Sequence, residues 1–425
     1  MEVKNKTVIL GAGLAGLSAA YHLREGYEIF EKEGECGGLC RSRSVKGFTF
    51  DIAGHLLHFK DKKNLVEVTK LLEGRISEHV RNSWVWTHGL FIPYPFQSNF
   101  SGLPAHAAQE CLEGFQHAQK SQSRQQSTNG LNFKEWIMQV FGEGIAKHFM
   151  VPYNEKFWKF PLERMDHPWA RQWIPAPSLD PKKETGYNVR FWYPCPGGIQ
   201  VLADSFVRRI KKVHTRCEAV KLDLKEKEVH FSNGLKVKFK TVITTIPLPE
   251  LARIAVPMPE RVKKEFLKLK YVSLYNVNLG LSKNPEREKH WIYFPQPDIS
   301  FYRLGVASNF SGYLAPAGAS SLYFEISYSK DQPFDRDHVL KRIMADCRKA
   351  GLVFEKEDIS VLDLNDVRYA YCLYDDERAS ALKTIQDYLK KHGIFSIGRY
   401  GGWKYASMED VMIEAQATAQ ALLKR

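Results

Sequence analysis

The sequence of 425 residues predicts an α/β fold, and three observations support this prediction. The first is a glycine-rich turn at residues 11–16, between an apolar run and an Ala-rich segment typical of a helix. The second is a mostly helical pattern between about 60 and 175, and the third is an apolar/polar alternation between about 265 and 370. Together they predict a Rossmann-type dinucleotide-binding domain, a helical domain and an antiparallel β-sheet domain.

Composition sets the broad class of the protein. Hydrophobic residues make up 44% of the chain, which is typical of a globular protein with a sizeable core. The formal net charge of +13 at pH 7 favours anionic ligands, but the basic runs are short and no nucleic-acid motif or metal-ligand spacing accompanies them. We therefore expect no nucleic-acid partner and no metal, with part of the charge lining a pocket for phosphates.

The cysteines and apolar runs indicate where the protein works. The seven cysteines are scattered and odd in number, as in cytosolic proteins whose thiols stay reduced. The N-terminus lacks the apolar core of a signal peptide, and no run approaches the ~20 apolar residues of a membrane span. We expect a cytoplasmic protein with no membrane partner, and the sequence leaves its oligomeric state open.

The first nucleotide-binding motif lies near the N-terminus. An apolar run is followed by Gly11, Gly13 and Gly16, with G-x-G-x-x-G spacing, and then by an Ala-rich helix. Glycines suit this turn because the backbone must approach a pyrophosphate that rests on the helix N-terminus. The next predicted strand ends at Glu31, about twenty residues beyond Gly11, where a carboxylate holds a ribose hydroxyl.

A second glycine pair narrows the choice of dinucleotide. Gly37, Gly38 and Arg41 lie in KEGECGGLCRS, which resembles the FAD-binding start of the amine oxidase and protoporphyrinogen oxidase group. Two later stretches look like the returning βαβ piece and the closing strand and helix of that group. The resemblance implies FAD, held by a domain assembled from the separated segments 1–60, 186–260 and 390–425. In the closing segment it implies cofactor contacts from Gly398, Met408 and Asp410.

The inserted segments supply the substrate site in this prediction. Residues 61–185 are expected to form a mainly helical substrate and uridine domain, and residues 261–389 an antiparallel sheet domain. Within the sheet, WIYFPQPDISFYR (291–303) predicts a hairpin with a Pro-containing turn. The hairpin ends on Arg303, a side chain that is rarely buried unless it is paired, so we expect it to face a bound anion.

Seven short motifs carry a more specific resemblance. They are, in chain order, DIAGHLLHF, IPYPFQSNF, YNEKFW, NVRFWYP, WIYFPQPDISFYR, AYCLYD and GRYGGWKY. Their order and spacing resemble those of UDP-galactopyranose mutases, most closely the eukaryotic-type enzymes. The resemblance implies an isomerase that interconverts UDP-galactopyranose and UDP-galactofuranose. In that family N5 of reduced FAD attacks the anomeric carbon, UDP is the leaving group, and there is no net oxidation.

The resemblance also assigns the catalytic residues and the diphosphate clamp. His55 would lie near the flavin and stabilise its reduced state, while Arg303 and Arg399 would act on the leaving group. Arginine suits this task because its guanidinium grips phosphate with two parallel hydrogen bonds. The residues that would bind the diphosphate side of the substrate are Tyr293, Arg303, Tyr371, Arg399 and Tyr405, with Asn188 at the ribose or diphosphate.

Two further groups of residues follow from the same resemblance. The residues that would hold the uridine are Tyr94, Gln97, Asn154 and Trp158. An aromatic face can stack on uracil, and an amide can pair with its polar edge. Arg81 and Ser83 lie at the spacing that the eukaryotic-type enzymes use for NADPH, which is therefore expected as a reductant of FAD.

The chain departs from the family pattern at three places. Trp173 stands where a second mobile arginine is usual, and Arg171, two residues earlier, is the predicted substitute in the substrate site. Cys372 replaces a proline, and Ala53 replaces a glycine in the loop before His55. Two alternatives therefore stay open: the same chemistry on another nucleotide sugar, and an FAD-dependent oxidoreductase of the amine oxidase or protoporphyrinogen oxidase type.

Overall fold

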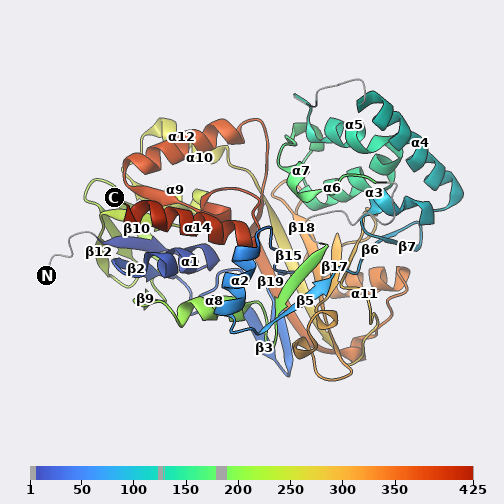
Figure 1. The fold of residues 1–425 in the computed structure, drawn as a ribbon, viewed down its shortest axis with the longest axis horizontal. Helices are drawn as coiled ribbons and strands as arrows, with labels where there is room; N and C mark the ends of the chain where they lie inside the picture. The colour runs from blue at the N-terminus through green and yellow to red at the C-terminus, as the bar shows by residue number, and fades with distance from the viewer. Residues whose placement is uncertain (1–5, 123–127, 129, 179–188, 425) are drawn as a thin grey trace.

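The protein consists of a dinucleotide-binding part, a large sheet and a helical insertion (Figure 1). The structure is a computed structural model that describes residues 6–122, 128, 130–178 and 189–424. In Figure 1 the two chain ends lie on the side of the dinucleotide-binding part, and the helical insertion lies at the opposite end. No helix among these residues is long and apolar enough to cross a membrane.

A five-stranded parallel sheet forms the centre of the dinucleotide-binding part. Its strands are β1 (Thr7–Leu10), β2 (Tyr27–Phe30), β9 (Val213–His214), β13 (Thr241–Thr244) and β20 (Ile394–Ser396), in the order β20-β13-β1-β2-β9. All four pairings are parallel. The strands come from three separated stretches of chain, so the predicted assembly of this fold is confirmed.

Two helices of small residues cover this sheet together. α1 (Leu14–Leu23) follows β1, and α14 (Met408–Leu423), from the other end of the chain, packs against it (Figure 1). Buried alanines on both helices permit this approach: Ala15, Ala19, Ala20, Ala415 and Ala419. The Ala-rich run after the glycine turn therefore serves helix packing as well as helix propensity.

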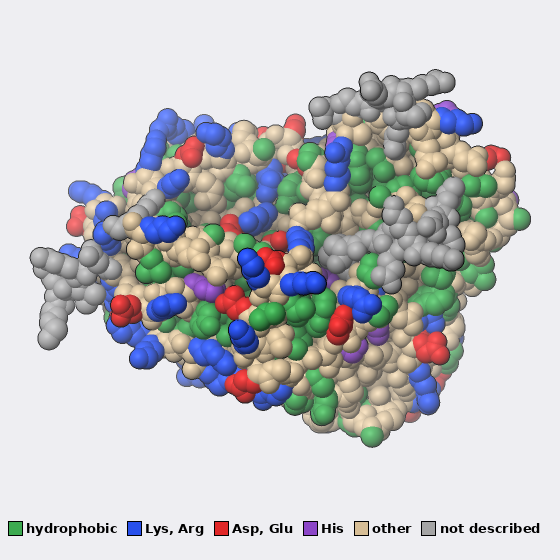
Figure 2. Space-filling model, viewed as in Figure 1, with side chains coloured by type: hydrophobic (Ala, Val, Ile, Leu, Met, Phe, Trp, Pro, Cys, Tyr) green, Lys and Arg blue, Asp and Glu red, His purple; other side chains and the backbone are tan. Residues whose placement is uncertain are grey.

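Further elements extend the dinucleotide-binding part. A second sheet has the order β12-β11-β10-β14. Its strands are β10 (Ala219–Asp223), β11 (Glu228–Phe231), β12 (Lys236–Lys238) and β14 (Ala255–Val256), and the helices nearby are α8 (Gln200–Val207), α9 (Leu248–Ile254), α10 (Glu260–Leu267) and α12 (Arg378–Lys391). Both lysines of the edge strand β12 are exposed. Figure 2 shows many Lys and Arg side chains over this part of the molecule, so much of the basic excess lies on the surface.

The large sheet has seven strands in the order β19-β15-β18-β17-β16-β6-β7. They are β6 (Ser83–Thr87), β7 (Leu90–Pro93), β15 (Tyr271–Leu281), β16 (Trp291–Tyr293), β17 (Arg303–Val306), β18 (Ser320–Tyr328) and β19 (Ile359–Cys372), with α11 (Val339–Lys349) packed on the sheet's apolar side. The pairings are antiparallel except that of β16 with β6. The predicted hairpin is confirmed, with Tyr293 opposite Arg303.

The segment predicted as mainly helical also contains strands. Its helices are α2 (Lys62–Leu71), α3 (Phe96–Asn99), α4 (Ala105–Gln122), α5 (Phe133–Ile145), α6 (Val151–Trp158) and α7 (Ala170–Trp173). β6 and β7 join the large sheet, and β5 (Ile76–Val80) pairs with β8 (Arg190–Pro194). The sequence analysis missed these strands, and the boundaries 61–185 and 261–389 stay predictions.

The close approach at Gly16 yields a test of the fold. In Gly16→Ala the new Cβ would overlap the carbonyl oxygen of Gly11, a main-chain atom that cannot move aside cheaply. We expect the free energy of unfolding to fall by about 1–3 kcal/mol, measured by denaturant unfolding. Gly312→Ala is the control, because nothing lies within 4 Å of the Cβ position there. Equal stability of the two variants would contradict the packing described.

Candidate active site

The glycine-rich turn between β1 and α1 forms a close-packed cradle with the Gly37–Gly38 pair. Gly37 donates its N–H to the carbonyl of Ala12 at 2.8 Å, and a Cβ on Gly38 would lie 3.1 Å from Cα of Gly13. Arg41 donates from Nε to the carbonyl of Gly38 at 2.9 Å, which fixes the end of this second loop. Side chains are thus absent where a pyrophosphate would meet the N-terminus of α1.

Glu31 lies where the sequence predicts a ribose contact, directly after β2. Its Oε2 accepts the N–H of Ala12 at 2.7 Å, and its Oε1 accepts the N–H of Glu33 at 3.0 Å. A carboxylate has about four acceptor positions, so both oxygens retain capacity for a ribose hydroxyl. The cradle and this carboxylate together fit the nucleotide half of FAD.

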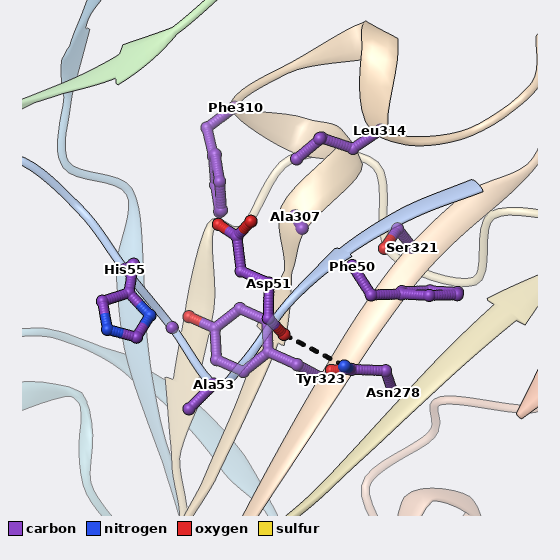
Figure 3. A pocket seen from close by; sticks show the side chains of 11 residues that line it. Phe50, Asp51, Ala53, His55, Asn278, Ala307, Phe310, Leu314, Ser321 and Tyr323 are labelled. Atoms are coloured by element: carbon purple, nitrogen blue, oxygen red, sulfur yellow. Dashed lines mark hydrogen bonds between the residues drawn. The ribbon is translucent and has the colours of Figure 1, made fainter. Parts of the chain in front are cut away.

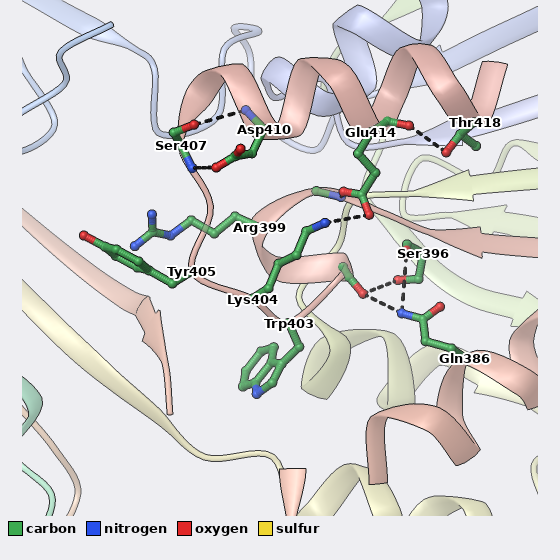
Figure 4. Close-up of polar contacts among 12 residues, drawn as sticks. Gln386, Ser396, Arg399, Trp403, Lys404, Tyr405, Ser407, Asp410, Glu414 and Thr418 are labelled. Atoms are coloured by element: carbon green, nitrogen blue, oxygen red, sulfur yellow. Dashed lines mark hydrogen bonds and ion pairs between the residues drawn. The ribbon is translucent and has the colours of Figure 1, made fainter. Parts of the chain in front are cut away.

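The N-terminus of α14 is tied to the segment that follows His55. Ser407 and Asp410 form a capping box, in which each side chain accepts the backbone N–H of the other residue (Figure 4). Asp410 also pairs with Lys60 at 2.9 Å. Glu409, only 1% exposed, accepts the backbone N–H of Lys60 at 2.8 Å. Asp410 therefore caps the helix that Met408 opens, and a flavin contact from either residue stays a prediction.

Gly398 lies at the other side of this region, where β20 meets the short helix α13 (Gly398–Gly401). Its N–H donates to Oε2 of Glu414 at 2.7 Å, and a Cβ there would lie 2.8 Å from Cβ of Ala15 in α1. The glycine therefore lets the GRYGGWKY segment approach α1 closely. This contact brings the closing segment to the cradle, as the sequence analysis expects.

The loop after β4 (Phe48–Asp51) carries His55 and is held by the large sheet (Figure 3). Asn276 on β15 accepts the N–H of Ala53 at 3.1 Å, and Glu325 on β18 accepts the N–H of Gly54 at 3.1 Å. Asn278, also on β15, donates to the carbonyl of Asp51 at 3.0 Å. A cavity of about 10 Å³, the space of a single water, lies between loop and sheet.

His55 is neutral at physiological pH in this environment. Burial lowers the pKa of His55 to about 4, and the positive charges of Arg399 and Arg303 act in the same direction. Its Nδ1 is buried and has no hydrogen-bond partner among the described residues. An imidazole with an unsatisfied ring nitrogen fits a site whose remaining partner is a ligand.

Arg303 is half of a buried ion pair that the sequence analysis did not predict. Its Nε and Nη2 donate to the two carboxylate oxygens of Glu325 at 2.8 and 2.7 Å. Glu325 has no exposed surface, whereas the Arg303 side chain keeps 22% of its own. The geometry is that of a two-pronged Arg–carboxylate pair, and it leaves Nη1 of Arg303 for another acceptor.

Arg399 is a partly buried cation without a carboxylate partner among the described residues. Its Nη1 and Nη2 donate to the carbonyls of Ala406 and Ala370, each at 3.0 Å, and its Nε is buried without a partner. The guanidinium lies 5.0 Å from the ring centre of Tyr371 and 4.7 Å from that of Tyr405 (Figure 4). Carbonyls and aromatic rings leave the positive charge uncompensated, so the site favours an anion.

Tyrosine rings connect the two arginines. The hydroxyls of Tyr302 and Tyr371 lie 3.3 Å apart, and Arg303 lies against Tyr302 while Arg399 lies against Tyr371. The ring centres of Tyr371 and Tyr405 are 5.6 Å apart. Burial raises the pKa of Tyr371, so this phenol stays a neutral hydrogen-bond donor.

The predicted uridine residues are divided between this cluster and the packing around it. The ring centre of Tyr94 lies 4.9 Å from that of Tyr293. Gln97 is buried and donates to the carbonyl of Pro175 at 2.7 Å, while its Oε1 has no partner among the described residues. Its free oxygen leaves Gln97 a potential ligand contact.

Asn154 and Trp158 form a pair within α6. The Trp158 indole, 1% exposed, donates to Oδ1 of Asn154 at 3.2 Å, and Asn154 donates to the carbonyl of Met150 at 2.7 Å. Both side chains thus have packing roles in this structure. Asn188 lies outside the described residues.

The structure distinguishes Trp173 from Arg171. Trp173 packs edge-on against Tyr405, with ring centres 4.6 Å apart, whereas Arg171 is exposed and bonds to Thr128. The predicted substitution of Arg171 for the missing arginine is therefore not seen in this conformation. An aromatic ring, rather than a second mobile cation, borders this side of the cluster.

Arg81 and Ser83, predicted to contact NADPH, differ in their exposure. Arg81 lies over the ring of Tyr94, with its guanidinium carbon 4.8 Å from the ring centre. Ser83, at the start of β6, is 4% exposed, and its hydroxyl is buried. Arg81 therefore borders the tyrosine cluster, whereas Ser83 is covered.

Two supporting residues were missed by the sequence analysis. Glu325 is a single acidic residue within an apolar strand, and that isolation was the available signal. Lys156 on α6 is buried and donates to the carbonyls of Phe294 and Gln296 at 2.9 and 2.8 Å, which holds the hairpin turn after Tyr293. Burial lowers the pKa of Lys156 to about 7.

Comparison with known proteins assigns the family. A model described as flavin containing amine oxidoreductase matches residues 14–423. The chain belongs to this family. The cradle at Gly11–Gly16 and the carboxylate of Glu31 are accordingly the FAD-binding features of an amine-oxidoreductase-family flavoenzyme.

Solved structures of flavoproteins of this fold align over nearly the whole chain. A structure of reduced UDP-galactopyranose mutase has a TM-score of 0.92 and 28% identity, and the alignment covers 99% of this chain and 94% of that one. A putative protoporphyrinogen oxidase from Exiguobacterium sp. 255-15 has a TM-score of 0.77 at 13% identity, and a putrescine oxidase variant 0.73 at 15%, each covering 99% of both chains. The last two share the fold, whereas the first also resembles the chain in sequence.

One curated protein matches over a short stretch. An uncharacterized protein in the nifH2 3' region of Methanothermococcus thermolithotrophicus is 41% identical over 54 residues, which is 12% of this chain. The chain spans about half the length of this relative, 53%.

Ala53 yields a test of the flavin-side loop of this amine-oxidoreductase-family protein. It replaces a glycine of the resembling mutases and has φ = 65°, a left-handed conformation in which a Cβ is strained. We expect Ala53→Gly to raise the free energy of unfolding by up to about 1 kcal/mol, measured by denaturant unfolding of the holoprotein. A loss of stability instead would show that the loop does not hold Ala53 in this conformation.

Proposed function

We propose that this flavoenzyme is a nucleotide-sugar mutase that interconverts UDP-galactopyranose and UDP-galactofuranose without net oxidation. The observation that carries the proposal is the partly buried charge of Arg399, which has no carboxylate partner among the described residues. Arg303 and the phenols between the two arginines add hydrogen-bond donors. Such a lining suits a nucleoside diphosphate and does not suit the apolar substrates of a desaturating oxidase.

The similarity to reduced UDP-galactopyranose mutase supports the same substrate class. The fold alone is shared with oxidases, so the choice between the two chemistries depends on the residues that face the reaction site. Here those residues are cations and phenols, with His55 as the group expected at the flavin. The sugar itself is proposed from the resemblance.

The residues of this chain would bind, orient and stabilise charge. When bound, reduced FAD would supply the nucleophilic nitrogen for displacement at the anomeric carbon. Nη1 of Arg303 and the Nε edge of Arg399 would hold the diphosphate and stabilise its charge as it leaves. The hydroxyls of Tyr371 and Tyr405 would add neutral donors, and the neutral imidazole of His55 would hold the flavin edge.

NADPH as the reductant of FAD is part of the proposal. Arg81 lies at the border of the tyrosine cluster, where a phosphate of a transient dinucleotide would find a cation. Ser83 is covered and would require a local movement to take part.

The proposal is tested by chromatography of UDP-galactofuranose incubated with the holoprotein. One sample is oxidised and the other is reduced with dithionite. Conversion to UDP-galactopyranose only in the reduced sample is the expected result. If neither sample converts this sugar nor any other nucleotide sugar, while FAD is bound, the mutase proposal fails.

A substitution at Arg399 tests the role of its charge. Because one charge-assisted phosphate bond contributes about 1.5–3 kcal/mol, we expect Arg399→Gln to lower kcat/KM by about 10- to 150-fold. FAD content should stay within error of the wild-type value, measured from the flavin absorbance. Arg253→Gln, which removes an exposed arginine paired with Glu250, is the matched control. Unchanged kcat/KM in Arg399→Gln would exclude Arg399 from the substrate site.

A further inference from the structure

Glu325 connects two parts of the site that are distant in sequence. It lies on β18 with no exposed surface, and its carboxylate accepts hydrogen bonds from Arg303 and from the N–H of Gly54. Arg303 belongs to the predicted diphosphate clamp, and Gly54 is the residue before His55. A single buried carboxylate therefore contacts both the clamp and the flavin-side loop.

The contact with Arg303 fixes the direction of the guanidinium. Glu325 occupies Nε and Nη2, so the opposite edge, with Nη1, faces away from the carboxylate. A planar guanidinium held by two parallel bonds cannot rotate freely, which prepares that edge for a ligand. The pair also has no net charge, so Glu325 positions Arg303 while Arg399 supplies the uncompensated charge.

The contact with Gly54 shares an oxygen with Arg303. Oε1 of Glu325 accepts from Nη2 of Arg303 at 2.7 Å and from the N–H of Gly54 at 3.1 Å. Two donors at one oxygen compete for its electron density. If a diphosphate draws the charge of Arg303 toward itself, Oε1 becomes a better acceptor for Gly54, and the loop is held more firmly.

Resting on the proposed function, we propose that Glu325 is a positioning residue that couples occupation of the diphosphate site to the loop that carries His55. The element with two arrangements is the Gly54 hydrogen bond, weak without the diphosphate and stronger with it. Diphosphate bound at Arg303 is thereby detected at the flavin. Loop and clamp then adopt their reactive arrangement together.

The first test uses the wild-type holoprotein and UDP as the probe. Calorimetry establishes that UDP binds, and amide hydrogen exchange follows a peptide that contains Gly54. We expect UDP to slow exchange of the Gly54 amide by more than about twofold, because its hydrogen bond to Glu325 strengthens. Bound UDP without slower exchange would overturn the coupling and leave the mutase proposal intact. If UDP does not bind at all, the mutase proposal fails and the coupling fails with it.

The second test removes the charge of Glu325 and keeps its shape. We expect UDP at saturation to perturb the visible spectrum of the flavin in the wild-type protein, and Glu325→Gln to reduce this amplitude at least about threefold. The comparison is made at saturation, so a change in UDP affinity does not alter it. A merely structural role would leave the amplitude unchanged once the variant has folded and bound FAD.

Asp346→Asn is the matched control for the second test. Asp346 is a carboxylate on α11 that is 6% exposed and accepts the N–H of Ser300 at 2.7 Å, with no contact to Arg303 or Gly54. This variant should keep the wild-type amplitude. A full amplitude in Glu325→Gln, or an equal loss in both variants, would overturn the proposal. Should Glu325→Gln fail to fold, the exchange measurement on the wild-type protein decides alone.

Discussion

The guanidinium groups of Arg303 and Arg399 impose the constraint on which the rest of the site depends. Removing a charge from water costs several kcal/mol unless partners compensate it. Glu325 compensates Arg303, whereas Arg399 has backbone carbonyls and tyrosine rings around it. The fold therefore holds one balanced cation and one unbalanced cation near the flavin-side loop, and an anionic substrate completes the arrangement.

The large sheet makes this arrangement rigid. Polar side chains on neighbouring strands, among them Asn276, Asn278 and Glu325, hold the backbone of the loop at residues 51–54. Lys156 fixes the hairpin turn on the other side. Strands from both insertions form this sheet, so the substrate site is built across the segments rather than within one of them.

The sequence predicted the parts of the fold that follow local rules. The glycine turn at Gly11–Gly16 and the hairpin from Tyr293 to Arg303 both depend on short-range patterns, and both are confirmed. β6 and β7 were missed because they gain their partners from residues two hundred positions away, and strand pairing of that range leaves little trace in local periodicity.

Long-range partners also limited the prediction of the site. Arg303 was predicted to face an anion, and the structure supplies a carboxylate of the protein itself, Glu325. Pairing across β17 and β18 decides that partner, and no spacing rule within a strand reveals it. Arg171 and Trp173 were similarly indistinguishable in sequence, because the contact of Trp173 with Tyr405 joins segments far apart.

The most direct test of the account is a crystal structure of the reduced holoprotein with UDP. The account predicts diphosphate oxygens within about 2.7–3.2 Å of nitrogens of both Arg303 and Arg399, with Glu325 still bound to Arg303 and Gly54. A diphosphate bound elsewhere, with Arg399 still lacking an anionic partner, would contradict it.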